Sequence, residues 1–154
     1  MIYLFYMAKK YAIQIKECNE PLVDIKKICP SVVVFLGKES TGKERKAFLR
    51  KTVAKMIRNA KKKLPKGMTF IIRDAWRPQH LQEEIFHQFV SRFSEKYPNW
   101  PKKRVVREVK KYVAPHDGKY VSGHMTGGAV DLRLLKHGRR VPMRSSKLSY
   151  QENA

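Results

Sequence analysis

The sequence has 154 residues, of which 42% are hydrophobic and 31% are charged. This length supports one domain with its own core and is too short for two, and the composition excludes a disordered chain. The 34 Lys and Arg against 13 Asp and Glu give a net charge of +21, which would suit a polyanionic partner. The sequence nevertheless carries no recognisable nucleic-acid-binding module, so nucleic acid is not the expected partner.

Residues 1–10 are predicted to be an N-terminal extension, in which the segment from Met7 is more typical of a protein start than the segment from Met1. Their apolar run is too short for a membrane span and lacks the basic segment that precedes a signal peptide, so we expect a cytoplasmic protein. The two cysteines, Cys18 and Cys29, have no CxxC spacing and are interpreted as reduced thiols, or at most one optional disulfide.

The first half of the chain predicts two strands and a long helix. The strands are expected at residues 11–16 and 32–36, with a turn-rich segment between them. Residues 44–63 predict a basic amphipathic helix that Pro65 and Gly67 end. Its apolar face consists of Phe48, Leu49, Val53, Met56, Ile57, Ala60 and Leu64. Its basic face could bind a polyanion, although such a face is more often simply solvated.

Residues 37–44 resemble a phosphate-binding loop, because they follow an apolar run and lead into a helix. Such a loop needs Ser or Thr after its lysine to hold magnesium. Here Glu44 follows Lys43 and would place a negative charge near the phosphates. The sequence therefore disfavours nucleotide binding.

A buried strand is predicted at residues 68–73, followed by helices at 78–97 and 101–113. The inner face of the first of these helices consists of Leu81, Ile85, Phe86, Phe89, Val90 and Phe93. Asp74 and Arg77 lie between the strand and this helix, at the rim of the sheet. Their spacing is compatible with a simple salt bridge. It is also compatible with a fixed cation where negative charge develops on a tetrahedral intermediate.

The segment Ser122 to Leu132 places His124 and Asp131 seven residues apart, across a glycine-rich turn that leads into a strand at residues 128–135. Imidazole and carboxylate are ligand types that hold catalytic zinc, and the glycines let the backbone double back so that both side chains reach one ion. The alternative is a turn histidine and a carboxylate that merely faces water. Together, these elements predict an α+β fold with helices packed on a mostly antiparallel sheet.

In these motifs the chain resembles the zinc-dependent D-alanyl-D-alanine dipeptidases. The family carries Asp-Ala-Tyr-Arg-Pro, here Asp74 to Pro78, and Ser-x-His-x-x-Gly-x-Ala-x-Asp-Leu, here Ser122 to Leu132. The likeness extends over most of the chain, from about residue 19 to 135, and implies a zinc peptidase fold of the Hedgehog/DD-peptidase type. It implies that His124 and Asp131 bind one zinc ion, that Arg77 stabilises the transition state, and that Asp74 and Ser122 shape the substrate pocket.

The family takes its third zinc ligand and its general base from a Glu-Trp-Trp-His segment near the C-terminus, which this sequence lacks. We therefore expect a C-terminally truncated domain over residues 11–143, a polar tail over 144–154, weak zinc affinity and poor hydrolysis. The other histidines are His80, His87, His116 and His137, each expected to be a surface or core residue, with His116 and His137 near enough in sequence to be considered as replacement ligands.

The predicted function is hydrolysis of the dipeptide D-alanyl-D-alanine, a peptidoglycan precursor. The alternative is an inactive zinc-binding remnant or a basic polyanion-binding module.

Overall fold

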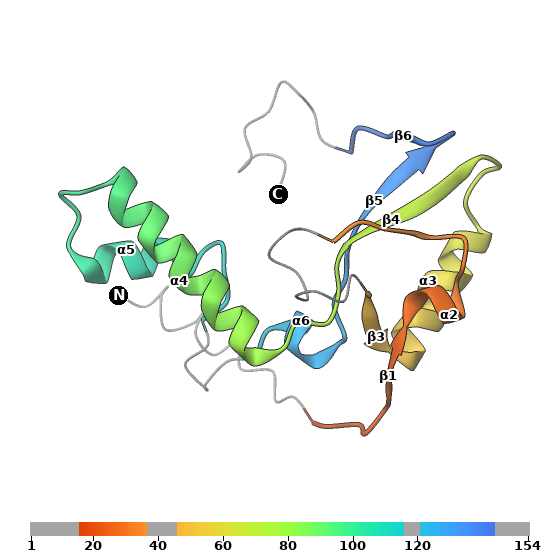
Figure 1. Cartoon of the computed structure of the whole chain (residues 1–154), viewed down its shortest axis with the longest axis horizontal. Helices are drawn as coiled ribbons and strands as arrows, with labels where there is room; N and C mark the ends of the chain where they lie inside the picture. Colours follow the sequence, from red (N-terminus) through yellow and green to blue (C-terminus); the bar gives the residue numbers. More distant parts are fainter. Residues whose placement is uncertain (1–15, 37–45, 116–120, 144–154) are drawn as a thin grey trace, which may run out of the picture.

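The computed structural model describes residues 16–36, 46–115 and 121–143, and it is an α+β structure (Figure 1). Its elements are β1 (Leu22–Asp24), α2 (Ile25–Ile28), β2 (Val33–Val34), β3 (Phe48–Arg50), α3 (Lys51–Lys62), β4 (Met68–Asp74), α4 (Gln79–Lys96), α5 (Lys102–Val109), α6 (Gly123–Thr126), β5 (Asp131–Lys136) and β6 (Arg139–Arg140). The N-terminal extension, the loop at 37–44, His116 and the polar tail lie outside the described residues, as does all but Lys16 of the strand predicted at 11–16.

The main sheet has four strands in the order β2-β4-β5-β6. Strand β5 runs antiparallel to both β4 and β6, and only the short β2 runs parallel to β4. A separate antiparallel pair joins β1 to β3. The predicted α+β class with mostly antiparallel pairing is therefore confirmed. Long strand β4 carries the centre of the core, where Ile72 is fully buried.

The helix predicted over residues 44–63 is wrong at its start, because α3 begins only at Lys51. Residues Phe48–Arg50 form β3 instead, and Leu49 pairs with Val23 of β1 and is fully buried. The apolar spacing of Phe48 and Leu49 continues the helical period, so only this pairing distinguishes strand from helix. Two residues of the predicted apolar face, Met56 and Ala60, are exposed.

The helices α4 and α5 form a second packing unit at the opposite end of the molecule from α3 and the paired strands β4 and β5 (Figure 1). As predicted, Leu81, Ile85 and Phe86 of α4 are buried, where they pack with Val105 and Val109 of α5. Helix α5 ends at Val109 rather than at residue 113. The backbone N–H groups of Lys111 and Tyr112 donate to carbonyls three residues earlier, so the chain tightens into turns.

A cavity of about 560 Å³ lies between these two units. Its walls come from the end of β4, the start of β5 and α6 on one side, and from α4 and the turn after α5 on the other. Among the described residues, no helix is long and apolar enough to span a membrane.

Candidate metal centre

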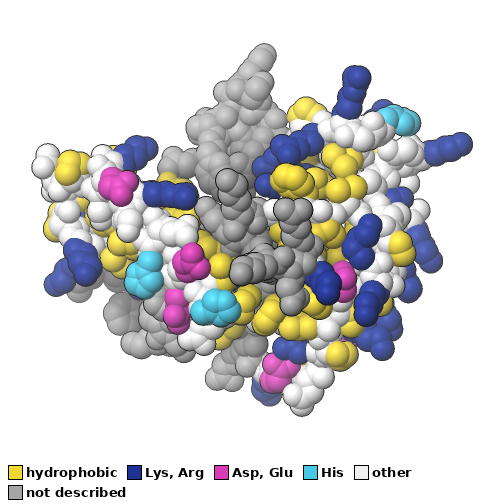
Figure 2. Space-filling view, viewed as in Figure 1, with side chains coloured by type: hydrophobic (Ala, Val, Ile, Leu, Met, Phe, Trp, Pro, Cys, Tyr) yellow, Lys and Arg dark blue, Asp and Glu magenta, His cyan; other side chains and the backbone are white. Residues whose placement is uncertain are grey.

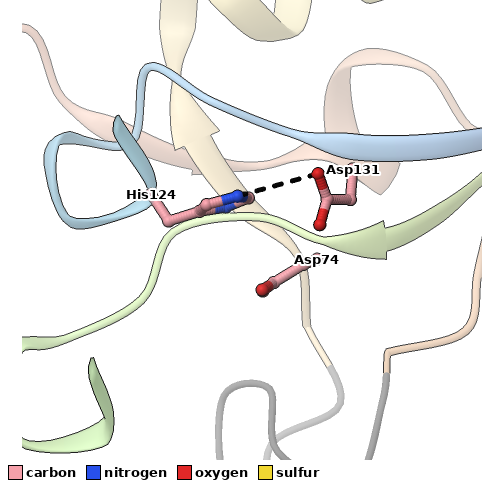
Figure 3. Close-up of side chains that lie close together, drawn as sticks. All are labelled: Asp74, His124 and Asp131. Atoms are coloured by element: carbon pink, nitrogen blue, oxygen red, sulfur yellow. Dashed lines mark ion pairs between the residues drawn. The ribbon is translucent and has the colours of Figure 1, made fainter. Parts of the chain in front are cut away.

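Three side chains converge at one edge of the cavity: Asp74 at the end of β4, His124 in α6 and Asp131 at the start of β5 (Figure 3). One ligand atom from each lies within 4.8 Å of those of the other two. Asp74 is buried, His124 is half-buried and Asp131 is exposed. A nitrogen and two carboxylate oxygens at this spacing could hold a metal ion.

The two carboxylates meet because of the register between β4 and β5. Ile72 pairs with Leu132, and the next pair is Asp74 with Asp131. One residue of β4, Arg73, is therefore left over between the two pairs, which is the pattern of a β-bulge. Bulges re-aim side chains, and this one turns Asp74 toward the strand position that carries Asp131.

His124 is presented by the single helical turn α6. The Ser122 hydroxyl caps this turn by accepting from the His124 backbone N–H at 3.3 Å. The turn ends at Gly127, whose φ of 72° is in the left-handed region that favours glycine. The chain thus doubles back between His124 and Asp131, as predicted from the glycine-rich sequence.

Backbone and side-chain bonds from other segments fix α6 in place. The Arg77 backbone N–H donates to the His124 carbonyl at 3.0 Å, and the Trp76 indole Nε1 donates to the Met125 carbonyl at 3.1 Å. Arg50 donates twice, from its backbone N–H to Gly127 at 3.0 Å and from Nε to Thr126 at 2.7 Å. The position of the imidazole therefore depends on β3 and on the segment after β4, and not on α6 alone.

The His124 ring is oriented by a backbone carbonyl. Its Nδ1 lies 2.9 Å from the Ala75 carbonyl oxygen, and its Nε2 lies 3.7 Å from Asp131 Oδ1. Because a carbonyl can only accept, Nδ1 carries the hydrogen and the Nε2 lone pair is free in the neutral ring. Metal-bound histidines are commonly held in this way through their second nitrogen.

Asp74 also forms the predicted pair with Arg77. Arg77 Nη2 donates to Asp74 Oδ2, and the side chains are 13% and 9% exposed. Arg77 Nη1 donates to Gln82 Oε1 at 2.6 Å, and Gln82 Nε2 donates to the Ala114 carbonyl at 2.8 Å. Arg77 is therefore held on both sides by polar groups that are themselves bonded.

All five residues expected at the site line the cavity together. Its described lining consists of Arg73, Asp74, Arg77, Gln82, Ile85, Phe89, Tyr112, Val113, Ala114, Ser122, His124 and Asp131. The Ser122 hydroxyl caps α6, which gives Ser122 a structural role in the turn that carries His124. His80, His87 and His137 are exposed, as expected of surface histidines, and do not join the cluster.

Sequence reasoning missed Gln82, Arg50 and Arg73. Gln82 is fully buried and occupies a position of α4 at helical spacing from Ile85 and Phe86, so a polar residue on a predicted buried face was a usable signal. No local pattern marks Arg50 or Arg73, because their positions depend on strand pairing.

No protein-family model matches the sequence, and a search of curated proteins finds no match.

Proposed function

We propose that this chain is a zinc-binding peptidase-type domain that acts on the dipeptide D-alanyl-D-alanine. The observation that carries the proposal is the convergence of Asp74, His124 and Asp131 at the edge of a cavity. The order and spacing of the two motifs, and their resemblance to the zinc-dependent dipeptidases, supply the choice of metal and substrate.

The donor set fits zinc. Two ligand atoms of a tetrahedral zinc ion with bonds of about 2.0–2.1 Å lie roughly 3.4 Å apart. The 3.7 Å between His124 Nε2 and Asp131 Oδ1 is close to this value. Asp74 provides a third ligand atom, so the chain offers three protein ligands where the sequence suggested two. Three protein ligands with a fourth position open is the usual arrangement of a catalytic zinc site.

Asp74 can serve the metal and its present partners together. Its Oδ1 accepts from the Ala75 N–H at 2.9 Å, and its Oδ2 accepts from Arg77. Each carboxylate oxygen has two acceptor sites, so both bonds leave a lone pair for an ion. The Arg77 charge would in turn offset the excess negative charge of two carboxylates around one divalent ion.

A zinc ion bound here would polarise the scissile carbonyl and lower the pKa of its bound water. Within this chain, Arg77 would stabilise negative charge as it develops on the carbonyl oxygen, and Gln82 would keep the guanidinium from swinging away. Asp74 and Asp131 are the acids among the described residues of the cavity wall. If both bind the metal, no further carboxylate of that wall accepts a proton from water, so turnover by these residues is slow.

The proposal is tested by mixing the purified chain with D-alanyl-D-alanine and measuring free D-alanine with and without added zinc. We expect slow release that depends on zinc and is lost in His124→Ala, with His80→Ala on the surface of α4 as the control. Release at the same rate in His124→Ala, or none above buffer with zinc present, would contradict the proposal.

A second candidate is the binding of a polyanion through α3. Exposed lysines lie along this helix, at Lys51, Lys55 and Lys62, and at its C-cap residue, Lys63. Figure 2 shows Lys and Arg side chains spread over the half of the molecule that contains α3 and the sheet, with few acidic side chains among them. Charge of one sign on one face is the electrostatic footprint of a polyanion-binding protein.

A further inference from the structure

Arg73 is the extra residue of the β-bulge between β4 and β5. In a regular strand, consecutive side chains point to opposite faces of the sheet. Here Arg73 and Asp74 both line the cavity. The bulge therefore brings a second arginine into the cavity beside the metal cluster, at a position where regular pairing would turn it away.

The two arginines of the cavity differ in how their nitrogens are engaged. Arg77 donates from both of its terminal nitrogens, to Asp74 and to Gln82, and its Nε is buried without a hydrogen-bond partner. Arg73 Cζ lies 4.8 Å from the centre of the Phe35 ring, a cation–π contact, but its Nη1 is buried without a hydrogen-bond partner. A buried donor left unpaired costs free energy that a bound acceptor would recover.

We propose that Arg73 binds a carboxylate of the substrate, so that the cavity takes small peptides whose free C-terminal carboxylate lies next to the scissile amide. The guanidinium is a planar fork that matches a carboxylate with two hydrogen bonds. Ile85, Phe89 and Val113 supply an apolar wall for short side chains in the same cavity. That the carboxylate lies next to a scissile amide rests on the proposed function. Binding of the carboxylate by Arg73 does not depend on it.

The test measures binding by calorimetry in the full chain without metal, so that the ligand is not consumed. The probes are D-alanyl-D-alanine and its C-terminal amide, which lacks the carboxylate charge. We expect the wild-type chain to bind the acid roughly ten- to a hundredfold more tightly than the amide, as for a hydrogen bond to a charged group. Arg73→Gln should bind both probes equally and weakly, and Arg73→Lys should retain part of the preference because it keeps the charge without the fork.

Arg133→Gln removes the same charge from an exposed position of β5 and should keep the preference. Equal affinity of the wild-type chain for acid and amide, an unchanged preference in Arg73→Gln, or no measurable binding of the acid would each overturn the assignment.

Failure of the proposed function is a separate result. A chain that prefers the acid through Arg73 but releases no D-alanine with zinc has the anchor without the reaction. A chain that releases D-alanine equally well after Arg73→Gln, with an unchanged KM, has the reaction without the anchor.

Discussion

Five polar residues of the cavity form one connected set around Asp74: Asp74, Arg77, Gln82, His124 and Asp131. This carboxylate lies between the Arg77 guanidinium and the potential ligand atoms of His124 and Asp131, and Gln82 supports Arg77 from α4. Removing one partner from a buried charged pair leaves the other uncompensated, which costs more than the pair itself contributes. Individual substitutions here are therefore expected to have large effects that do not simply add.

Arg77→Lys tests whether Arg77 acts in the transition state. A lysine keeps the charge but cannot bond Asp74 and Gln82 together while also facing the carbonyl oxygen. In the zinc-loaded chain we expect kcat to fall by about a hundredfold, with a much smaller change in KM. Steady-state release of D-alanine measures both constants, with Arg133→Lys as the control. An unchanged kcat would reduce Arg77 to a structural partner of Asp74.

At the scale of residues, the sequence was most informative where chemistry is local. Two short motifs each carry a pair of site residues that are close in sequence, Asp74 with Arg77 and His124 with Asp131. The structure places all four residues in the lining of one cavity. The position of Asp74 beside His124 and Asp131 was not predictable, because it follows from the β4–β5 register and its bulge. Gln82 was not predicted for a similar reason, since its role depends on α4 lying against the turn after α5.

At the scale of elements, the cluster of Asp74, His124 and Asp131 depends on the turn α6, and that turn is sensitive to substitution at Gly127. Alanine there would adopt a left-handed φ, and its Cβ would lie 2.4 Å from Leu22 Cδ2. The backbone strain alone costs about 1–2 kcal/mol. Because Leu22 must also move, the turn that carries His124 should shift.

We therefore expect Gly127→Ala to lower both the free energy of unfolding and the zinc affinity. Denaturant unfolding and zinc titration measure the two effects. The control is Gly138→Ala, where φ is also positive, at 76°, but no atom lies within 4 Å of the added Cβ. That variant should lose similar stability and keep its zinc affinity. Equal zinc affinities in the two variants would show that α6 does not position the ligand.

The start of α3 depends on a distant carboxylate. Its N-cap residue, Arg50, makes no side-chain cap, and Glu20 Oε1 instead accepts from the Thr52 backbone N–H at 3.0 Å and from the Thr52 hydroxyl. The hydroxyl bond from Thr52 is the main cause that lowers the pKa of Glu20 below its ordinary value of 4.5. The folded state therefore favours the ionised carboxylate.

This lowered pKa predicts a pH dependence of stability. The Glu20 contribution is fully present above the ordinary pKa and is lost as the pH falls through the lowered value in the folded state. Glu20→Gln should unfold more easily than wild type at neutral pH, with a smaller further loss between about pH 5 and pH 3. Urea unfolding across this range checks it, with the exposed Glu95→Gln as the control. Parallel curves for Glu20→Gln and wild type would refute the role of Glu20.

The elements that the sequence predicted well are those with long periodic patterns, such as β4 and α4. Strand β1 and helix α2 were not predicted, because three or four residues in a turn-rich segment give no period to detect. Strand β3 was assigned to a helix because its apolar residues continue the helical spacing of α3, and only the pairing with β1 identifies it as a strand.

At the scale of the whole molecule, the net charge of +21 and the exposed lysines of α3 predict salt-dependent binding to polyanions. The chain should bind a short DNA duplex at low salt, with an affinity that falls steeply as salt rises and that drops in the triple variant Lys51→Glu, Lys55→Glu and Lys62→Glu. Fluorescence anisotropy at several salt concentrations checks this, with His124→Ala expected to bind DNA as wild type does. Salt-independent binding would contradict an electrostatic origin.

The arrangement of two packing units around one cavity places the candidate metal site where residues of both units contribute. The sheet and α6 carry the candidate ligands, and α4 supports them through Gln82 and Arg77. The proposed reaction therefore depends on whether a metal ion binds at this junction.

Zinc titration of the purified chain, in competition with a chromophoric chelator, tests this claim most directly. We predict one zinc ion per chain, with affinity reduced at least about a hundredfold in His124→Ala and at least about tenfold in Asp131→Asn and Asp74→Asn, since changes to outer-shell partners alone cost ten- to a hundredfold. His80→Ala, on the exposed side of α4, should bind as wild type does. Equal zinc affinity in wild type and His124→Ala would contradict the metal centre, and with it the proposed reaction.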